Sequence, residues 1–495
     1  MANRLTREQI LTIYNQGPDA VVAIIEMLQD RIEQLEQRVD HLEQIIRKDS
    51  HNSSKPPSSD GFKRMPRSLR GKSRRSSGGQ AGHPGTTLCQ VSNPDHVVEH
   101  RLQGNCGCGR SLDEAQRMGH ERRQVVDLPP VKAEVTEHRA EIGRCACGQR
   151  HVAEFPEDVK APVQYGERVK ALVLYLIFYQ LIPLKRTAEL FGDFLGIPLS
   201  QGTLKTICHN AYESLHSTEA FIQERIRGSP SIHVDETGLY VGGKRHWLHS
   251  YGTRLFTYYC HHEKRGKEAM DAAGILPGYR GRATHDYWRP YYGFDCLHSL
   301  CNAHHLRELV FVAEELGQHW AQQMTALLRR IKTTVDRAVD RNRTQIHAAT
   351  RKAYWERYQA ILKEGYRVNP ASSQQRKPGQ RGRTKQSPAR NLLDRFKHHA
   401  HEALAFMEDF SVAFDNNLAE RDLRMMKVQQ KISGCFRTQL GAKIFCRVRS
   451  FISTVKKQRL NVIEFLGECA TVNNGQTILL PDPLNREPGT RNLGT

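Results

Sequence analysis

The chain is short of acidic residues relative to basic ones, and it lacks a long apolar run. The longest run, ALVLYLIFYQLIPL at 171–184, has about the length of a core helix. It falls short of the roughly 20 residues that span a bilayer. The opening MANRLTREQI carries no secretion signal. These absences argue against a membrane or secreted protein and predict a cytoplasmic one without a membrane partner.

The acid deficit indicates a polyanionic partner. Lys and Arg number 73 against 53 Asp and Glu, which gives a formal charge of +20 over 495 residues. A basic surface releases counterions when it binds phosphates, so nucleic acid is the expected partner. The alternative is a basic protein that is merely soluble. The mean hydropathy of −0.61 is low for one compact globule and favours a folded, multidomain body with polar appendages.

The N-terminal region carries a heptad pattern. β-branched residues occupy position a, and mainly leucine occupies position d, as in parallel two-stranded coiled coils. The pattern predicts a helical leucine-zipper region at 1–48 and a homodimer or higher oligomer through residues 21–46. The alternative is an amphipathic helix that packs on the body. The heptad residues are Val21, Ile25, Leu28, Ile32, Leu35, Val39, Leu42 and Ile46.

The segment 49–88 changes to Ser, Pro, Gly, Lys and Arg, a composition that cannot bury a core. It is predicted to be a basic flexible linker. Its cations could contact phosphates or could simply be solvated, and the composition does not separate these alternatives.

Two Cys-X-Cys pairs follow, Cys106 with Cys108 and Cys145 with Cys147. Twelve cysteines in a chain of expected intracellular location favour metal ligands or buried thiols over disulfides. Four thiolates can close a tetrahedral zinc site, so we expect a small zinc-knuckle module at 89–160. The stretch between the pairs, QVVDLPPVKAEVTEHRAEIG, alternates as short strands would. Buried thiols without metal are the alternative.

The remaining chain alternates between helical and strand patterns. The helical stretch at 161–228 includes a pattern similar to a helix-turn-helix, and is interpreted as a DNA-binding region. Strands SIHVDET, GLYVGGKRHWLHSYG and RLFTYYCHH, a helix and the strand RATHDYW then open an α/β ribonuclease H-like fold. The expected boundaries are 229–296 for the first part of this core, 297–405 for a helical insertion, 406–470 for the C-terminal helices and 471–495 for a tail.

Two aspartates stand beside apolar strand residues, Asp235 in IHVDE and Asp286 in THDYW. A carboxylate in a buried strand is costly unless it is paired or binds metal. A lone aspartate would more simply start a turn. Two of them at the ends of two strands of one sheet predict a shared site.

A third acid, Glu420, lies in AFDNNLAERDLR, about one turn into a predicted helix that Asp415 or Asn416 would cap. Asn417, Arg424 and Lys427 share its helix face. Nearby cations keep a carboxylate ionised, as a metal ligand must be. Three carboxylates on separate elements could bind two Mg²⁺ or Mn²⁺ ions.

Several motifs resemble those of insertion-sequence-66 family DDE transposases, and the likeness covers nearly the whole chain. They are HVDET, HWLHSYG, THDYW, CNAHHLREL and FDNNLAERDLRMMKVQQKISGCFRT. The resemblance implies that Asp235, Asp286 and Glu420 form the catalytic triad and hold the metal ions. It also implies a large helical insertion between the last two acids.

As such an enzyme, the protein would nick the double-stranded DNA of element ends and join the freed 3′-hydroxyls to target DNA. It would lie at the bacterial nucleoid, together with accessory proteins of the element. The side chains expected to contact DNA are Asn417, Arg421, Arg424, Lys427 and Arg437.

Two other functions fit parts of the sequence. One is a non-catalytic DNA-binding regulator, although an acid at Glu420 would then only repel phosphate. The other is a metal-dependent hydrolase of a different substrate. The chain departs from the usual CxxC knuckle spacing. In CNAHHLREL, Cys301 with His304 or His305 could pack, support the site or bind metal.

Overall fold

The computed structural model describes residues 6–46, 48–49, 51–53, 88–129, 131–371, 386–471 and 478. The chain divides into two compact units. One comprises 1–69, 138–189 and 199–495, and the other comprises 70–137 and 190–198. The predicted linker and tail lie almost wholly outside the described residues.

The N-terminal region is helical, as its heptads predict. Helix α1 spans Arg7–Asn15 and begins with a capping box at Thr6. Gly17, at φ 103°, separates it from α2, which runs as one helix over Pro18–Ile46. The heptad side chains on α2 are about half exposed, for example 46% at Leu28. The helix is therefore confirmed, and its pairing with a second copy stays a prediction.

The strands expected between the cysteine pairs do not form over most of that stretch. Strand β1 begins only at its end, at Ile142–Arg144, and pairs antiparallel with β2, Arg150–Val152. Upstream, Val125 and Val135 are 92% and 91% exposed. The alternating pattern was misleading because strands need a partner and a buried face, and the described residues give these valines neither.

The region expected to be helical at 161–228 is helical. Helix α3 spans Glu167–Leu174 and continues as a π-helical turn, η3, over Tyr175–Tyr179. Helices α4 and α5 follow at Leu184–Leu195 and Gln201–Ser214, and α6 spans His216–Arg227. The oxygen of Ser200 accepts a hydrogen bond from Thr203 N, so Ser200 is the predicted N-cap of α5.

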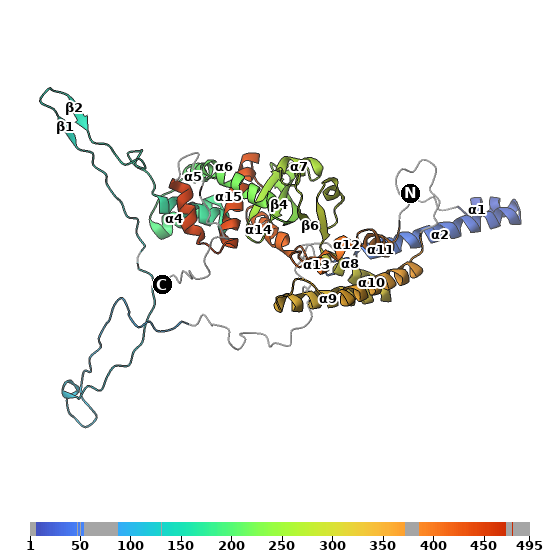
Figure 1. The fold of residues 1–495 in the computed structure, drawn as a ribbon, viewed down its shortest axis with the longest axis horizontal. Coiled ribbons are helices and arrows are strands. Elements are labelled where there is room, and N and C mark those ends of the chain that lie inside the picture. The colour runs from blue at the N-terminus through green and yellow to red at the C-terminus, as the bar shows by residue number, and fades with distance from the viewer. Residues whose placement is uncertain are drawn as a thin grey trace. The chain divides into compact units, whose positions relative to one another are not determined.

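A five-stranded mixed sheet forms the centre of the larger unit. Its order is β5-β4-β3-β6-β7, in which β3, β4 and β5 are antiparallel neighbours and β6 and β7 run parallel to β3. Figure 1 shows part of this sheet beside helix α7, Lys267–Ala273. The strands are β3 Ser231–Val241, β4 Lys244–Gly252, β5 Thr257–His262, β6 Arg282–His285 and β7 Leu297–Leu300.

The expected strands are present, with one addition. Strand β3 continues through the first arm of the predicted hairpin, which turns at Gly242 and Gly243, both with positive φ. Residues 297–300, expected to be helical, instead form β7 beside β6. Four residues are too few for a period to be read, and the adjoining helix dominated the pattern. The sheet therefore extends past the expected boundary at 296.

The predicted insertion follows β7 and is helical. Helices α9 and α10 pack side by side along it (Figure 1). The basic segment between α10 and α11 lies mostly outside the described residues. The helices are α8 Asn302–Glu314, α9 His319–Asp340, α10 Ala348–Val368, α11 Pro388–His398, α12 Ala400–Ala403 and α13 Ala405–Glu408.

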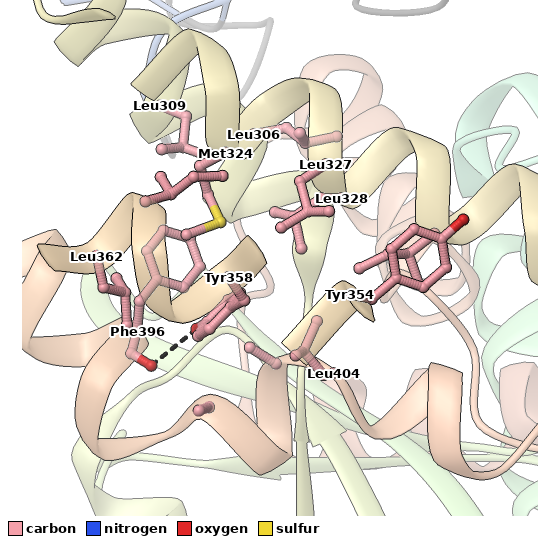
Figure 2. Packing of buried hydrophobic residues seen from close by; sticks show 14 of the residues in the cluster. Leu306, Leu309, Met324, Leu327, Leu328, Tyr354, Tyr358, Leu362, Phe396 and Leu404 are labelled. Carbon is pink, nitrogen blue, oxygen red and sulfur yellow. Dashed lines mark hydrogen bonds between the residues drawn. The ribbon is translucent and has the colours of Figure 1, made fainter. Parts of the chain in front are cut away.

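These helices enclose their own apolar core. Figure 2 shows side chains from α8, α9, α10 and α11 converging, with Met324 beside Leu309 and Tyr354 at one side. The buried hydroxyl of Tyr358 is satisfied within this core, because its Oη donates to the Phe396 carbonyl at 2.7 Å. The insertion is therefore a packed body that can hold α8 in a fixed position.

The last three helices return to the sheet. Helix α14, Asn417–Ser433, packs on β3 and β4, and α15, Gln439–Lys457, packs on β5. Helix α16, Val462–Thr471, packs on α3 and α5. Among the described residues, no helix combines the length and apolarity needed to cross a bilayer.

Candidate active site

The two candidate aspartates lie level with each other on neighbouring parallel strands. Ser231 of β3 faces Arg282 of β6, and His233 faces Thr284. Two residues further along each chain come Asp235 and Asp286. Side chains two apart point to the same face of a sheet, so the register sets both carboxylates at one edge of the strand pair.

Asp235 is electrostatically strained without a cation. Burial raises the pKa of its carboxyl well above the usual range, and the negative charges of Glu236 and Asp286 raise it further. A hydrogen bond from the Glu236 amide to Asp235 Oδ1, at 2.8 Å, and the nearby His304 act in the opposite direction. The balance favours a proton on Asp235, or a metal ion in place of the proton.

Asp286 begins a sharp change of chain direction. Its Oδ1 accepts a hydrogen bond from the Trp288 amide at 3.1 Å. Between them, Tyr287 has φ 76°, a left-handed conformation that is costly for a residue with a large side chain. Strain of this kind persists only where surrounding packing holds it, which is common at functional sites. Here it fixes Asp286 at the end of β6.

Glu420 reaches the site from the first turn of α14. Its Oε1 lies 3.9 Å from His304 Nε2, and its Oε2 lies 3.7 Å from Arg307 Nη2. His304 and Arg307 belong to α8, the first helix of the insertion. Glu420 therefore lies where α14 faces the insertion. Because His304 also interacts with Asp235, it links the aspartates to the glutamate.

Asp422, two residues along the same helix, points elsewhere. Its Oδ2 binds Lys457 Nζ at 2.6 Å and Thr257 Oγ1 at 3.2 Å. This ion pair ties α14 to α15 and leaves Glu420 as the acid of α14 that faces α8.

Asn416 does not cap α14 through its side chain, contrary to one sequence expectation. It occupies the N-cap position but is buried, and its amide bonds to His233 Nδ1 at 2.8 Å and to the Val234 carbonyl at 2.9 Å. Asp415 accepts a hydrogen bond from the Asn417 amide instead. Asn416 thus fixes the start of α14 to β3, one residue before Asp235.

The two histidines of CNAHHLREL have different positions. His305 is fully buried, bonds to Asn302 at 3.1 Å and packs on Phe396. Burial lowers the pKa of His305 well below its usual value, so it stays neutral as a core residue. His304 is the histidine that faces Glu420.

The side chains predicted to contact DNA differ in exposure. Arg421, Arg424 and Arg437 are exposed. Lys427 donates to the Gly238 carbonyl at 3.3 Å, and burial lowers its pKa. Asn417 is half-buried. The arginines can meet phosphate, whereas Lys427 first serves to hold α14 on β3.

Arg437 borders a basic cavity of about 410 Å³ at the β3–β4 turn. Lys244, Arg245 and Lys264 line it with Arg437, and Glu263 is the acid among its lining residues. The sequence does not show that these cations lie together. Lys244 and Arg245 come from β4, Lys264 follows β5, and Arg437 precedes α15. Their convergence depends on a bond between Gly242 N and the Phe436 carbonyl.

Each cysteine pair folds into the same local turn. Cys106 N donates to Arg110 O at 2.9 Å and Gly109 N donates to Cys106 O at 2.8 Å. Cys145 repeats the pattern with Gln149 and Gly148. Both glycines have φ near 90°, which only glycine adopts readily. All four cysteines are exposed, so each turn presents two sulfurs outward as a metal knuckle does.

A further acid escaped the sequence interpretation. Glu236, beside Asp235, is almost fully buried, and its carboxylate binds Arg265 at 2.6 Å and Tyr291 Oη at 2.5 Å. Burial and Asp286 raise its pKa, whereas Tyr291 and Arg265 lower it. Adjacent residues of a strand point to opposite faces of the sheet, so Glu236 points away from the face of Asp235 and has a structural role. Its charge nevertheless adds to the repulsion at Asp235.

Three family models match the chain. A model described as the transposase IS66 family matches residues 162–444, more than half of the chain, and includes all three candidate acids. A model of the zinc-finger binding domain of transposase IS66 matches residues 103–148, which contain the four cysteines. A family of unknown function matches residues 8–88. No curated protein matches the chain at a significant level.

Proposed function

Because the chain belongs to the IS66 transposase family, we propose that it nicks DNA at transposon ends and joins the 3′-hydroxyls to target DNA. The single observation that carries this proposal is the convergence of charge at one site. Asp235 and Asp286 end level on parallel strands, and Glu420 approaches from α14 through His304. The strand order, with three antiparallel strands and two parallel ones, supports a ribonuclease H-like core.

The three carboxylates suit a hard divalent cation. Mg²⁺ prefers carboxylate oxygens, and two such ions can activate the attacking hydroxyl and stabilise the leaving oxygen of a phosphodiester. The raised pKa of Asp235 arises from burial and two like charges. A bound cation would relieve this repulsion, so the donor set fits two Mg²⁺ or Mn²⁺ ions held by Asp235, Asp286 and Glu420.

The residues around the acids hold the reacting groups in place. Asn416 anchors α14, which orients Glu420, and Tyr287 fixes Asp286. Arg421 and Arg424 on α14, and Arg437 with the basic cavity, would bind the DNA phosphates. Asn417 and Lys427, partly engaged within the fold, would support that surface.

The zinc-finger domain supports a structural zinc ion. We infer that Cys106, Cys108, Cys145 and Cys147 hold it, because both turns present paired sulfurs. The exposed heptads of α2 support a dimer, which would bring two copies to the two ends of an element.

Strand cleavage tests the catalytic assignment. The protein is incubated with Mg²⁺ and DNA that carries the element's ends, and the products are separated on denaturing gels. Glu420→Gln, Asp235→Asn and Asp286→Asn should each lower the cleavage rate about a hundredfold or more while DNA binding persists. Glu356→Gln, at an exposed acid on α10, is the matched control and should cut normally.

If Glu420→Gln cuts as fast as the wild type, the metal-ligand assignment is wrong. If the wild type binds the ends without cutting under any divalent cation, the function is that of a DNA-binding regulator.

A further inference from the structure

A second group of side chains that can bind a metal ion overlaps the three acids at Glu420. The ligand atoms of Cys301, His304 and Glu420 all lie within 4.8 Å of one another. In the part of the chain that the structure describes, this is the one such group of three. Cys301 follows β7 as the N-cap residue of α8, His304 lies in the first turn of α8, and Glu420 comes from α14.

The Cys301 sulfur is buried, and it accepts a hydrogen bond from the Asn416 backbone amide at 3.1 Å. An amide donor aimed at a sulfur stabilises a thiolate. The thiolate is the form of cysteine that binds a divalent cation.

Each of the other two ligands has a buried atom that makes no hydrogen bond. Among the described residues, neither His304 Nδ1 nor Glu420 Oε1 makes a hydrogen bond. His304 Nε2 and Glu420 Oε1 are 3.9 Å apart, too far for such a bond. Ligand atoms around a tetrahedral zinc ion lie roughly 3.3 to 3.8 Å apart, given bonds of about 2.0 to 2.3 Å. The separation between His304 Nε2 and Glu420 Oε1 is close to this range, and the Cys301 sulfur lies within 4.8 Å of the other two ligand atoms.

We propose that Cys301, His304 and Glu420 form a site for a borderline-soft divalent cation of the Zn²⁺ class, with its fourth position open. Thiolate and imidazole select such ions over Mg²⁺, which takes oxygen ligands. The site shares Glu420 with the proposed catalytic triad. An ion in it would hold Glu420 toward α8, so that Zn²⁺ would inhibit the Mg²⁺-dependent reaction. Only this inhibition rests on the proposed function; the binding does not.

Zinc stoichiometry tests the binding. The full chain is saturated with Zn²⁺, freed of loosely held metal by gel filtration and analysed by atomic absorption. The wild type should hold two ions, one in the zinc-finger domain and one at the proposed site. Cys301→Ser and His304→Gln should each hold one. Cys446→Ser, which changes another buried cysteine, on α15, should retain two.

Cobalt spectroscopy isolates the new site. In a Cys108→Ser/Cys147→Ser background, which disables the knuckles, added Co²⁺ should give a charge-transfer band from one thiolate. The further change Cys301→Ser should abolish that band. Circular dichroism of each variant shows whether the fold is intact, and His304→Gln, which leaves the thiol in place, should weaken Co²⁺ binding at least tenfold.

The outcomes separate this proposal from the catalytic one. A wild type that holds a single ion, lost with the knuckle cysteines, overturns the Cys301 site even if DNA is cut normally. Two ions in the wild type and one in Cys301→Ser support the site even if no cleavage is found. Where cleavage occurs, a further equivalent of Zn²⁺, added once the zinc-finger domain is filled, should slow the wild type about tenfold. Unslowed cleavage would overturn the sharing of Glu420.

Discussion

At the scale of single residues, Asn416 connects segments that lie far apart in the sequence. Its side-chain amide bonds to His233 and to the Val234 carbonyl, and its backbone N–H bonds to the Cys301 sulfur. Strand β3, the start of α8 and the start of α14 thus meet at one residue. Since buried polar groups are costly to leave unpaired, this residue determines where α14 starts and where Glu420 points.

Asn416→Ala should lower the free energy of unfolding by about 2 kcal/mol or more, because it leaves the Val234 carbonyl and His233 unpaired in the interior. Urea titration followed by circular dichroism measures the change. Asn417→Ala, at the half-buried neighbour, should alter the free energy by less than about 0.5 kcal/mol. Equal effects of the two substitutions would contradict the role given to Asn416.

Asp235 should make metal-free stability depend on pH. Its pKa in the fold is raised above the value of about 3.9 in an unfolded chain. The stabilisation by its protonated form is therefore complete below pH 4 and is lost as the pH rises through the folded pKa. With EDTA present, the wild type should lose stability relative to Asp235→Asn as the pH rises above about 4.

Urea unfolding at several pH values provides the measurement, and Mg²⁺ should restore stability to the wild type but not to Asp235→Asn. Asp336→Asn, in a surface pair with Lys332, is the control and should follow the wild type. Parallel pH curves for the wild type and Asp235→Asn would show that the carboxyl is not strained.

Sequence patterns could identify the three acids but not their partners. Asp235 and Asp286 stood out because a charge in an apolar strand is costly, and Glu420 because an acid on a basic helix needs a purpose. Arg307 carries no such signal, and the motif CNAHHLREL left open whether His304 or His305 faces the site. The significance of His304 and Arg307 depends on α8 packing beside α14, which lies more than a hundred residues further along the chain.

At the scale of elements, local chemistry decided which predictions succeeded. The turn at Gly242 and Gly243 and the Ser200 cap follow from backbone preferences and were predicted. Strand β7 was missed because pairing with β6, rather than its own four residues, makes it a strand. The strands expected between the cysteine pairs are absent for the complementary reason. Their residues alternate as in a strand, but no described segment pairs with them.

The close packing of α10 on α11 depends on a glycine, which has no side chain. Gly365 of α10 is buried, and a Cβ there would collide with Leu393 and lie 3.1 Å from Trp320. Gly365→Ala should therefore destabilise the protein by about 1 to 3 kcal/mol through overpacking. This cost should exceed the gain of up to about 1 kcal/mol that alanine brings to a helix.

Thermal unfolding measures this change against Gly192→Ala on α4, where a Cβ would meet nothing within 4 Å. That control should be neutral or stabilising. Stabilisation at both positions would mean that α10 and α11 do not pack as closely as described.

At the scale of the whole molecule, the apolar stripe of α2 is predicted to pair with a second copy of the chain. Its heptad side chains are about half exposed, including Leu28 and Leu35. Two such helices would bury these residues in a coiled coil. Charge and family membership predict the DNA partner, but a sequence cannot state how many copies assemble, because that depends on surfaces between chains.

Leu28→Asp/Leu35→Asp should convert a dimer into a monomer, since each change places a charge at a buried d position. Light scattering coupled to gel filtration gives the mass. Met27→Asp/Gln34→Asp introduces two acids at solvent-facing positions of the same helix and should leave the dimer intact. A wild type that is monomeric at micromolar concentration would exclude the zipper.

The placement of Glu420 on α14 also determines when the third acid is made during synthesis of the chain. A ribosome releases the zipper helix, the cysteine knuckles and both aspartates before it reaches the third acid, which follows Asp286 by 420 − 286 = 134 residues. The insertion must be made, and α14 must dock on β3, before the three carboxylates can meet. Glu420 and the arginines proposed to bind phosphate, Arg421, Arg424 and Arg437, are therefore synthesised last, so a chain that ends inside the insertion lacks the third acid of the proposed triad.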